Sequence, residues 1–143
     1  MKQERKQIVN TDAYSLEIDI AKNRVYFCIR GHWDKNTLLT NYLLDWKEAI
    51  SYLQPNFTII SDTLTMLPHA VSVEKLHEET QKYLIDNGLF KVAEIMPIND
   101  IANLQANRIT ERSQLPVIKL SSLEEAEECL DKLVEEMQNS LNH

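Results

Sequence analysis

The sequence predicts an α/β fold with the element order β-β-α-β-α-β-α-β-α. Short apolar runs bounded by Pro, Gly or polar turns alternate with longer segments whose apolar residues recur every three or four positions. This alternation is typical of right-handed crossovers, so we expect a mostly parallel five-stranded sheet with an antiparallel first strand. The 143 residues contain no repeat or low-complexity stretch, which indicates one domain over residues 1–143 with its core at about 14–138.

The first two strands are expected to form a hairpin. In residues 14–20 apolar and polar residues alternate, which predicts a strand with one buried face, lying at the edge of the sheet. Residues 21–24 form a polar turn. Residues 25–30 are apolar on both faces and predict an interior strand that pairs with the first.

Three pairs of helix and strand follow. Pro55 ends the first helix, Ser72 is a candidate N-cap of the second, Gly88 is its candidate left-handed terminator, and Asn99 or Asp100 can cap the third. The helices are expected at residues 36–54, from 73 to the Gly88 terminator, and from about 100 through the apolar positions Ile101, Leu104 and Ile109. The strands are expected at residues 57–61, 92–96 and 116–120.

The acid of the chain is concentrated near its end. The chain has 22 Asp and Glu against 15 Lys and Arg, a net charge of -7, and residues 121–143 hold seven acids and one base. Apolar residues from Leu123 to Leu141 recur there at helical spacing, and Ser121 or Ser122 can begin a capping box. We expect an amphipathic helix over residues 122–138, with its apolar stripe on the sheet and its acids turned outward, either solvated or docked to a basic partner.

The composition limits the compartments in which the protein is expected and the classes of partner that it is expected to bind. No stretch approaches the roughly 20 apolar residues of a membrane-spanning helix, and residues 1–10 lack the apolar core of a signal peptide. Two cysteines without C-x-x-C spacing suit a reducing compartment. We therefore expect a cytoplasmic protein without membrane insertion, and the excess of acid disfavours nucleic acid as a partner.

No local motif indicates a reaction. With only Gly31 and Gly88, the chain has no phosphate loop, dinucleotide fingerprint or nucleophile elbow, so we expect no catalytic residue and no cofactor. His69 and His77 lie eight residues apart, whereas a helical zinc pair is spaced by four, so no metal site is expected. His77 is expected to be a polar flank of its helix.

Four segments carry a resemblance to a known family: residues 23–33 (NRVYFCIRGHW), 57–62 (FTIISD), 101–108 (IANLQANR) and 122–126 (SLEEA). Together with the order of elements, they make residues 14–137 similar to the SpoIIAA-like proteins, which belong with the STAS domains and are grouped with SEC14-type lipid-binding domains. The resemblance implies a β-α superhelix whose helices pack on a small sheet, and a role in binding or regulation in a bacterial cytosol.

The resemblance also implies a site of regulation. In the family, a partner kinase phosphorylates a Ser or Thr at the start of the helix after the third strand, where free N–H groups favour a phosphate. Ser72 stands at about that position in the run Pro-His-Ala-Val-Ser-Val, which lacks the family's Asp and Gly. Ser72 is therefore a phosphorylation candidate, and helix capping is its alternative role.

In a parallel sheet, ligands usually bind beyond the carboxyl ends of the strands. Trp33 could stack on a ligand there and Asp62 could accept a hydrogen bond from it. Alternatively, Trp33 packs over the first helix and Asp62 binds loop N–H groups. The candidates for ligand or partner binding are His32, Trp33, Asp62, Thr63, Asn99 and, on the third helix, Arg108, whose alternative is a solvated helix face.

Three functions stay open from the sequence. The first is a non-catalytic regulatory or protein–protein interaction domain that binds a protein partner or a second copy of itself. The second is a binding domain for a small apolar or lipid-like ligand, which needs a pocket lined by residues such as Trp33, Tyr42, Trp46, Met66 and Leu67. The third is an enzyme that uses His32 and Asp62. Residues 63–71 carry Leu64, Met66 and Leu67 without clear periodicity and could form a lid over a pocket or an exposed apolar docking strip.

Overall fold

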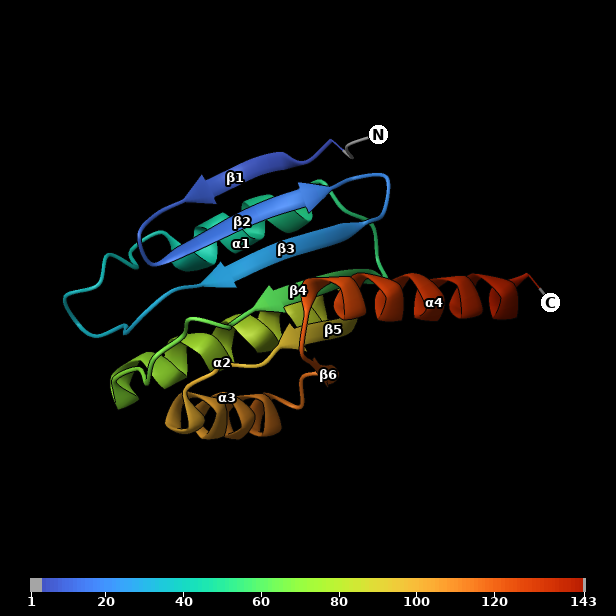
Figure 1. Ribbon diagram of the computed structural model, residues 1–143. Helices are drawn as coiled ribbons and strands as arrows, with labels where there is room; N and C mark the ends of the chain where they lie inside the picture. Colours follow the sequence, from blue (N-terminus) through green and yellow to red (C-terminus); the bar gives the residue numbers. More distant parts are fainter. Residues whose placement is uncertain (1–3, 143) are drawn as a thin grey trace.

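The computed structural model describes residues 4–142 and contains one six-stranded sheet and four helices (Figure 1). The strands are β1 (Lys6–Asn10), β2 (Tyr14–Asp19), β3 (Arg24–Ile29), β4 (Phe57–Asp62), β5 (Leu89–Ile95) and β6 (Val117–Leu120). The helices are α1 (Tyr42–Ser51), α2 (Val71–Asp86), α3 (Asp100–Ser113) and α4 (Leu123–Leu141). The predicted α/β class is confirmed, and so is the order of elements from β2 onward.

The strands lie side by side in chain order, from β1 to β6. β1, β2 and β3 form an antiparallel meander, as expected for the hairpin of β2 and β3. β3, β4, β5 and β6 are parallel, because a helix returns the chain to the starting edge before each new strand. The carboxyl ends of these parallel strands therefore share one edge of the sheet.

β1 changes the expected number of strands from five to six. It pairs along the outer side of β2, from Lys6 opposite Ile18 to Asn10 opposite Ser15, so β2 is not the edge strand that the sequence predicted. A register shift between Gln7 and residue 9 interrupts the alternation that would reveal a strand. A bulge and charged residues are typical of an edge strand that is protected from pairing with other chains.

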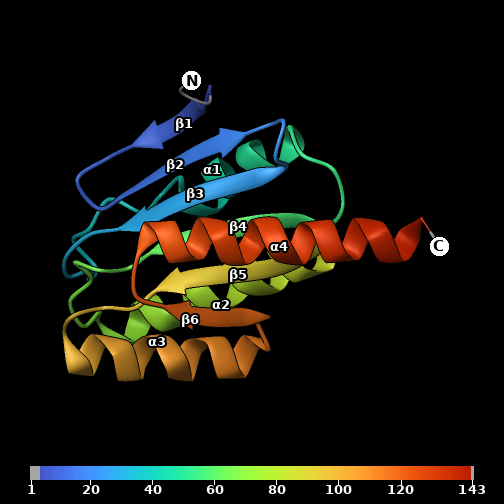
Figure 2. The same cartoon turned by 45° about the vertical axis from the view of Figure 1, so that its right-hand side comes forward.

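The helices cover the two faces of the sheet unequally (Figure 2). α1, α2 and α3 pack on one face over the larger core, and α4 lies alone on the other face. Successive side chains of a strand belong to opposite layers, so Phe27 faces the larger core and Tyr26 faces the layer of α4. α4 buries Ala126 and Leu130 in that layer, which confirms that its apolar stripe seals the sheet. None of the helices within residues 4–142 has a stretch long and apolar enough to span a bilayer.

Helix capping agrees with the sequence at two helices and differs at a third. Asn99 caps α3 and Ser122 caps α4, each by accepting a backbone N–H at 2.9 and 3.2 Å respectively. The prediction that Ser72 caps the second helix is wrong. α2 begins at Val71, and its N-cap position is Ala70, which has no side-chain acceptor. Ser72 therefore lies within the first turn of α2, where its side chain is exposed.

Two other helix ends follow from local chemistry. α1 begins at Tyr42 instead of residue 36, because Asp34 and Thr37 form a hydrogen-bonded turn in the preceding segment. α2 ends where predicted, since Gly88 has a φ of 99° just after the helix. A Cβ atom at Gly88 would lie 3.1 Å from Cα of Pro55, so glycine is needed both for the backbone conformation and for the close approach.

Candidate functional site

The candidate site lies at the edge where the parallel strands end. Backbone contacts join the loops that follow β3 and β5 to the loop that follows β4. Gly31, after β3, forms an isolated bridge with Met66, and the N–H of Ile98, after β5, donates to the carbonyl of Leu64 at 3.2 Å. Gly31 has a φ of 66°, which lets the chain after β3 turn toward the loop after β4. The structure thus brings together the loops that the sequence assigned to this edge.

Six apolar side chains are exposed on these loops and on the first turns of α2 and α3. We call them the end patch: Val71 (78% exposed), Ile98 (76%), Ile101 (66%), Leu104 (65%), Leu67 (46%) and Leu64 (39%). Ile101 and Leu104 are apolar positions of the predicted third helix, but the buried face of α3 carries Ala102, Ala106 and Ile109 instead. Isolated exposed apolar residues are ordinary, whereas a group of them on adjoining segments is typical of a contact surface.

Two buried histidines stack on Trp33 beneath the loops of this edge. The Trp33 ring centroid is 4.7 Å from that of His69 and 5.1 Å from that of His77, with the rings nearly parallel. His69 Nδ1 and His77 Nε2 are 3.1 Å apart and share a hydrogen bond. The prediction of His77 as a polar flank is wrong, because His77 lies on the same face of α2 as the buried Val73 and Leu84.

Burial keeps both imidazole rings uncharged. Desolvation lowers the pKa of His69 to about 4 and that of His77 to about 3. A neutral pair needs a single proton for its shared hydrogen bond, whereas two protonated rings would repel each other across 3.1 Å. The pair is packed in the core against Trp33. Within residues 4–142 no group of three or more His, Cys, Asp or Glu side chains could hold a metal ion.

A buried network ties the segment before α2 to α3. The side-chain amide of Gln105 accepts the backbone N–H of His69 at 2.6 Å and donates to the His69 carbonyl at 2.8 Å. It also donates to Glu74, which is 3% exposed and accepts from Arg108 and Arg112. The hydrogen bond from Arg108 is the main reason that the pKa of Glu74 falls to about 2. Arg108, a predicted binding residue, is therefore already paired inside the protein.

The predicted residues His32 and Trp33 lie in opposite environments. The His32 side chain is half exposed, bonds the Pro68 carbonyl, and lies 3.6 Å from the carboxylate of Asp34. Trp33 is 1% exposed and donates its indole N–H to the Ala13 carbonyl at 3.2 Å. Trp33 therefore has the packing role that was its alternative, and only His32 is accessible to a partner.

The other predicted residues at this edge make local contacts. Asp62 accepts the N–H of Leu64 at 3.1 Å, Thr63 donates to a backbone carbonyl of β5, and Asn99 caps α3. Among residues 4–142, no hydrogen bond or ion pair joins His32 to Asp62. The geometry therefore offers no support for an enzyme built on these two residues.

A cavity of about 60 Å³ lies between the sheet and the helices α1, α2 and α3. Of the residues expected to line a pocket for an apolar ligand, Tyr42, Trp46 and Met66 do so, whereas Trp33 and Leu67 do not. Pockets for drug-sized ligands usually hold about 300–1,000 Å³. An acyl chain would therefore not fit this cavity without rearrangement of its walls.

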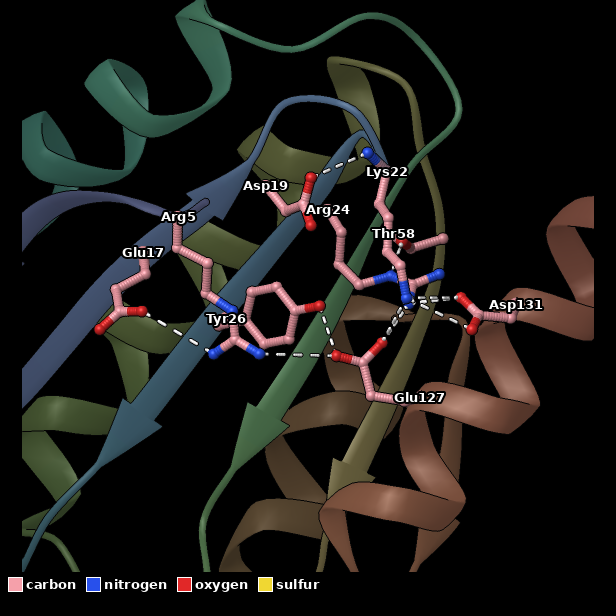
Figure 3. Close-up of polar contacts among 9 residues, drawn as sticks. All are labelled: Arg5, Glu17, Asp19, Lys22, Arg24, Tyr26, Thr58, Glu127 and Asp131. Carbon is pink, nitrogen blue, oxygen red and sulfur yellow. Dashed lines mark hydrogen bonds and ion pairs between the residues drawn. The ribbon is translucent and has the colours of Figure 1, made fainter. Parts of the chain in front are cut away.

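A second polar cluster, shown in Figure 3, fixes α4 to the sheet. Arg24, whose side chain is 1% exposed, donates to Glu127 at 2.6 Å and to Asp131 at 2.9 Å. Lys22 contacts both carboxylates at 3.2 Å, and the Tyr26 hydroxyl donates to Glu127. Burial alone would raise the pKa of Glu127, but these hydrogen bonds and the charge of Arg24 lower it below its ordinary value.

This ionic cluster corrects the expected orientation of the acids in the last helix. Glu127 and Asp131 are spaced by four and both pair with Arg24 on the sheet, and Glu127 is largely buried, whereas the side chain of Asp131 stays 51% exposed. The outward acids are Glu124, Glu125, Glu128, Glu135 and Glu136. The acidic helix is therefore held by charge as well as by its apolar stripe, and a charge reversal at Glu127 is not neutral for the fold.

Comparison with known proteins identifies the fold. No family model and no curated protein matches the chain. Among solved structures, it is similar to an uncharacterised DUF3478-family protein with a SpoIIAA-like fold from Shewanella loihica PV-4. That match has a TM-score of 0.58 and 10% identity and covers 85% of this chain and 97% of that one. SiaC of Pseudomonas aeruginosa is also similar, with a TM-score of 0.47, 12% identity and coverage of 82% and 99%. The fold is thus SpoIIAA-like, as the resemblance implied.

Proposed function

We propose that this chain is a non-catalytic regulatory domain of a bacterial cytoplasm that binds a partner protein through the end patch. The observation that carries the proposal is the grouping of six exposed apolar side chains on two adjoining segments, residues 64–71 and 98–104. A surface of this kind suits the apolar centre of a protein interface better than a small-molecule site, which is normally concave. The SpoIIAA-like fold is compatible with such a role.

The test compares two triple variants with equal loss of apolar surface. The patch variant carries Ile98→Ser, Ile101→Ser and Leu104→Ser, and the control carries Ile20→Ser, Leu44→Ser and Leu141→Ser. The control residues are 56%, 62% and 73% exposed and lie outside the patch. Both variants should keep a cooperative thermal transition, because all six side chains are on the surface.

We expect the wild type and the control variant to bind the same partner from native extracts, and the patch variant to lose it. Sedimentation analysis of the purified chain covers the case in which the partner is a second copy, since only the patch variant would then become monomeric. Equal binding by the patch variant and the control would contradict the proposal, and so would a monomeric wild type that captures nothing.

Ser72 supplies the regulatory part of the proposal. It is exposed and directly follows Val71 of the end patch. The N-cap position Ala70 offers no side-chain acceptor, so N–H groups at the start of α2 are available to a phosphate, which would bring up to about two negative charges to the patch. Added charge should weaken docking to an apolar surface.

We expect Ser72→Asp to reduce partner affinity about tenfold and Ser72→Ala to leave it unchanged, measured by titration calorimetry. Equal affinities of the two variants would remove Ser72 from the proposal.

A further inference from the structure

The cavity between the sheet and the helices α1, α2 and α3 has the features of a small binding site. Its volume is about 60 Å³, and β3, β4, β5 and all three helices contribute to its wall. Most of the wall is apolar and includes the aromatic rings of Phe27, Tyr42 and Trp46. None of the six residues of the end patch lines the cavity. The two features can therefore be tested separately.

Two polar groups of the wall residues have no hydrogen-bond partner among residues 4–142: the indole N–H of Trp46 and the hydroxyl of Thr80. Both residues are 2% exposed. The Tyr42 hydroxyl lies close enough to the Trp46 indole N–H to interact with it, but the contact falls short of full hydrogen-bond geometry. Native proteins leave few buried polar groups unpaired, because such a group gives up its bonds to water and gains none in return.

Five other polar side chains of the wall already have partners. Thr63 and Thr110 donate to backbone carbonyls, Gln81 accepts from Ser113, Glu94 pairs with Lys119, and His77 shares its hydrogen bond with His69. The charge of Glu94 is balanced by Lys119, so no free counter-ion is present for a charged ligand. The wall is therefore suited to a neutral molecule.

We propose that this cavity binds a compact neutral molecule of about four to six non-hydrogen atoms that carries one hydrogen-bond acceptor and one donor, as azoles and small amides do. The Trp46 indole can only donate, so it binds the acceptor, and the Thr80 hydroxyl pairs with the donor. The size follows from the cavity volume, because one water-sized group needs about 10–15 Å³. This inference goes beyond the proposed function and does not depend on it.

Ordered water is the competing occupant. The same volume would hold about four or five waters, each of which typically makes about three hydrogen bonds. A mostly apolar wall with two unpaired polar groups offers too few partners for such a cluster. A single ligand can pair with both groups and contact the apolar wall at the same time.

The test uses pyrazole, which has adjacent acceptor and donor nitrogens, and thiophene, a ring of the same size without them. The chain has two tryptophans. In a ¹H–¹⁵N NMR titration of the full chain, pyrazole should move the indole N–H signal of Trp46 downfield. The signal of Trp33, whose N–H already donates to the Ala13 and Arg30 carbonyls, should stay in place.

Two variants locate the binding. Thr80→Val keeps the side-chain shape and removes an unpaired hydroxyl, so it should fold, weaken pyrazole about fivefold and leave thiophene within about twofold. Ala106→Leu adds volume to the wall and should abolish binding of both, and Ala106→Val serves if the larger side chain prevents folding. Three outcomes overturn the proposal: no movement of the Trp46 signal, which indicates hydration only, equal effects of Thr80→Val on the two ligands, or binding that survives the filled cavity.

Discussion

His69 and His77 show how burial sets the chemistry of single side chains. Both are almost fully buried, stacked on Trp33, and held to each other by one hydrogen bond. Their folded pKa values of about 4 and about 3 lie below the ordinary 6.5. Between these values the unfolded chain takes up protons that the folded chain does not. The contribution of the uncharged histidine pair to the free energy of unfolding is therefore complete above pH 6.5 and is lost as the pH is lowered toward 3 to 4.

The lowered pKa values of the two histidines predict that the protein already loses stability in mildly acidic solution. We expect the free energy of unfolding, measured by urea titration, to fall by about 2–4 kcal/mol between pH 7 and pH 5. Glu74, with a pKa lowered from 4.5 to about 2, contributes only further down, since its stabilisation is lost as the pH falls from 4.5 through 2. The loss between pH 7 and pH 5 therefore reports on the histidines.

Two substitutions identify the source of this pH dependence. His77→Phe keeps a ring against Trp33 and removes one titrating group, so the loss between pH 7 and pH 5 should shrink by about half. Ile98→Ser, at an exposed apolar residue that does not titrate, should leave the loss unchanged. A stability that does not vary between pH 7 and pH 5 in the wild type would show that the histidine pair is charged or exposed.

Glu127 and Glu128 are neighbours in sequence with opposite roles. Glu127 is partly buried and binds Arg24, Lys22 and Tyr26, whereas Glu128 is exposed. Glu127→Lys places a third positive charge beside Arg24 and Lys22 and should cost about 2–3 kcal/mol in thermal or urea unfolding. Glu128→Lys makes the same change in net charge and should stay within about 0.5 kcal/mol of the wild type. Equal effects of the two reversals would mean that the ionic cluster does not hold α4.

At the scale of elements, Gln105 couples α3 to the segment that carries part of the end patch. Its amide makes two hydrogen bonds to the backbone of His69 and one to Glu74. Gln105→Ala should therefore loosen residues 63–70 while the sheet stays intact. We expect faster hydrogen–deuterium exchange in this segment and unchanged exchange in β3 and β4, with the exposed Glu111→Ala on the same helix as the control. Unchanged exchange at residues 63–70 would show that this contact is not needed to order the segment.

The elements that the sequence predicted well are those with a strong local signal. The alternation in β2, the apolar run of β3, the terminator Gly88 and the caps Asn99 and Ser122 are all present in the structure. β1 was missed because its alternation is interrupted at the register shift, and Ser72 was misplaced because α2 begins without a side-chain cap. In α3 the small residues Ala102 and Ala106 are buried while the larger Ile101 and Leu104 are exposed, since small residues allow the closest packing on a neighbouring helix.

At the scale of the whole molecule, the ionic cluster of Arg24 and the end patch lie at opposite ends of the parallel strands. The ionic cluster of Arg24 lies where β3 and β4 begin, and the end patch lies beyond the ends of the parallel strands. The net charge of -7 is concentrated on α4, and two of the acids of this helix, Glu127 and Asp131, pair with Arg24 in the ionic cluster. We therefore expect substitutions in the cluster to change stability without changing partner specificity, and substitutions in the patch to do the reverse.

The candidate site was predictable only in part. The sequence predicted that His32, Asp62 and Asn99 follow the ends of parallel strands, and the topology places them there. It could not show that these side chains make separate local contacts, or that Ile98 would be exposed while His77 is buried. Those properties depend on how α2 and α3 are rotated about their own axes where they pack on the sheet, and residue type alone does not determine this rotation. The spacing of Val73, His77, Thr80 and Leu84 on one face of α2 was the signal that could have placed His77 in the core.

The measurement that tests the central proposal most directly is hydrogen–deuterium exchange of the full chain, free and bound to its captured partner. We predict slower exchange on binding in residues 63–72 and 97–104, which carry the end patch, and unchanged exchange along the outer face of α4. Protection confined to α4, with none at the end patch, would contradict the proposed function.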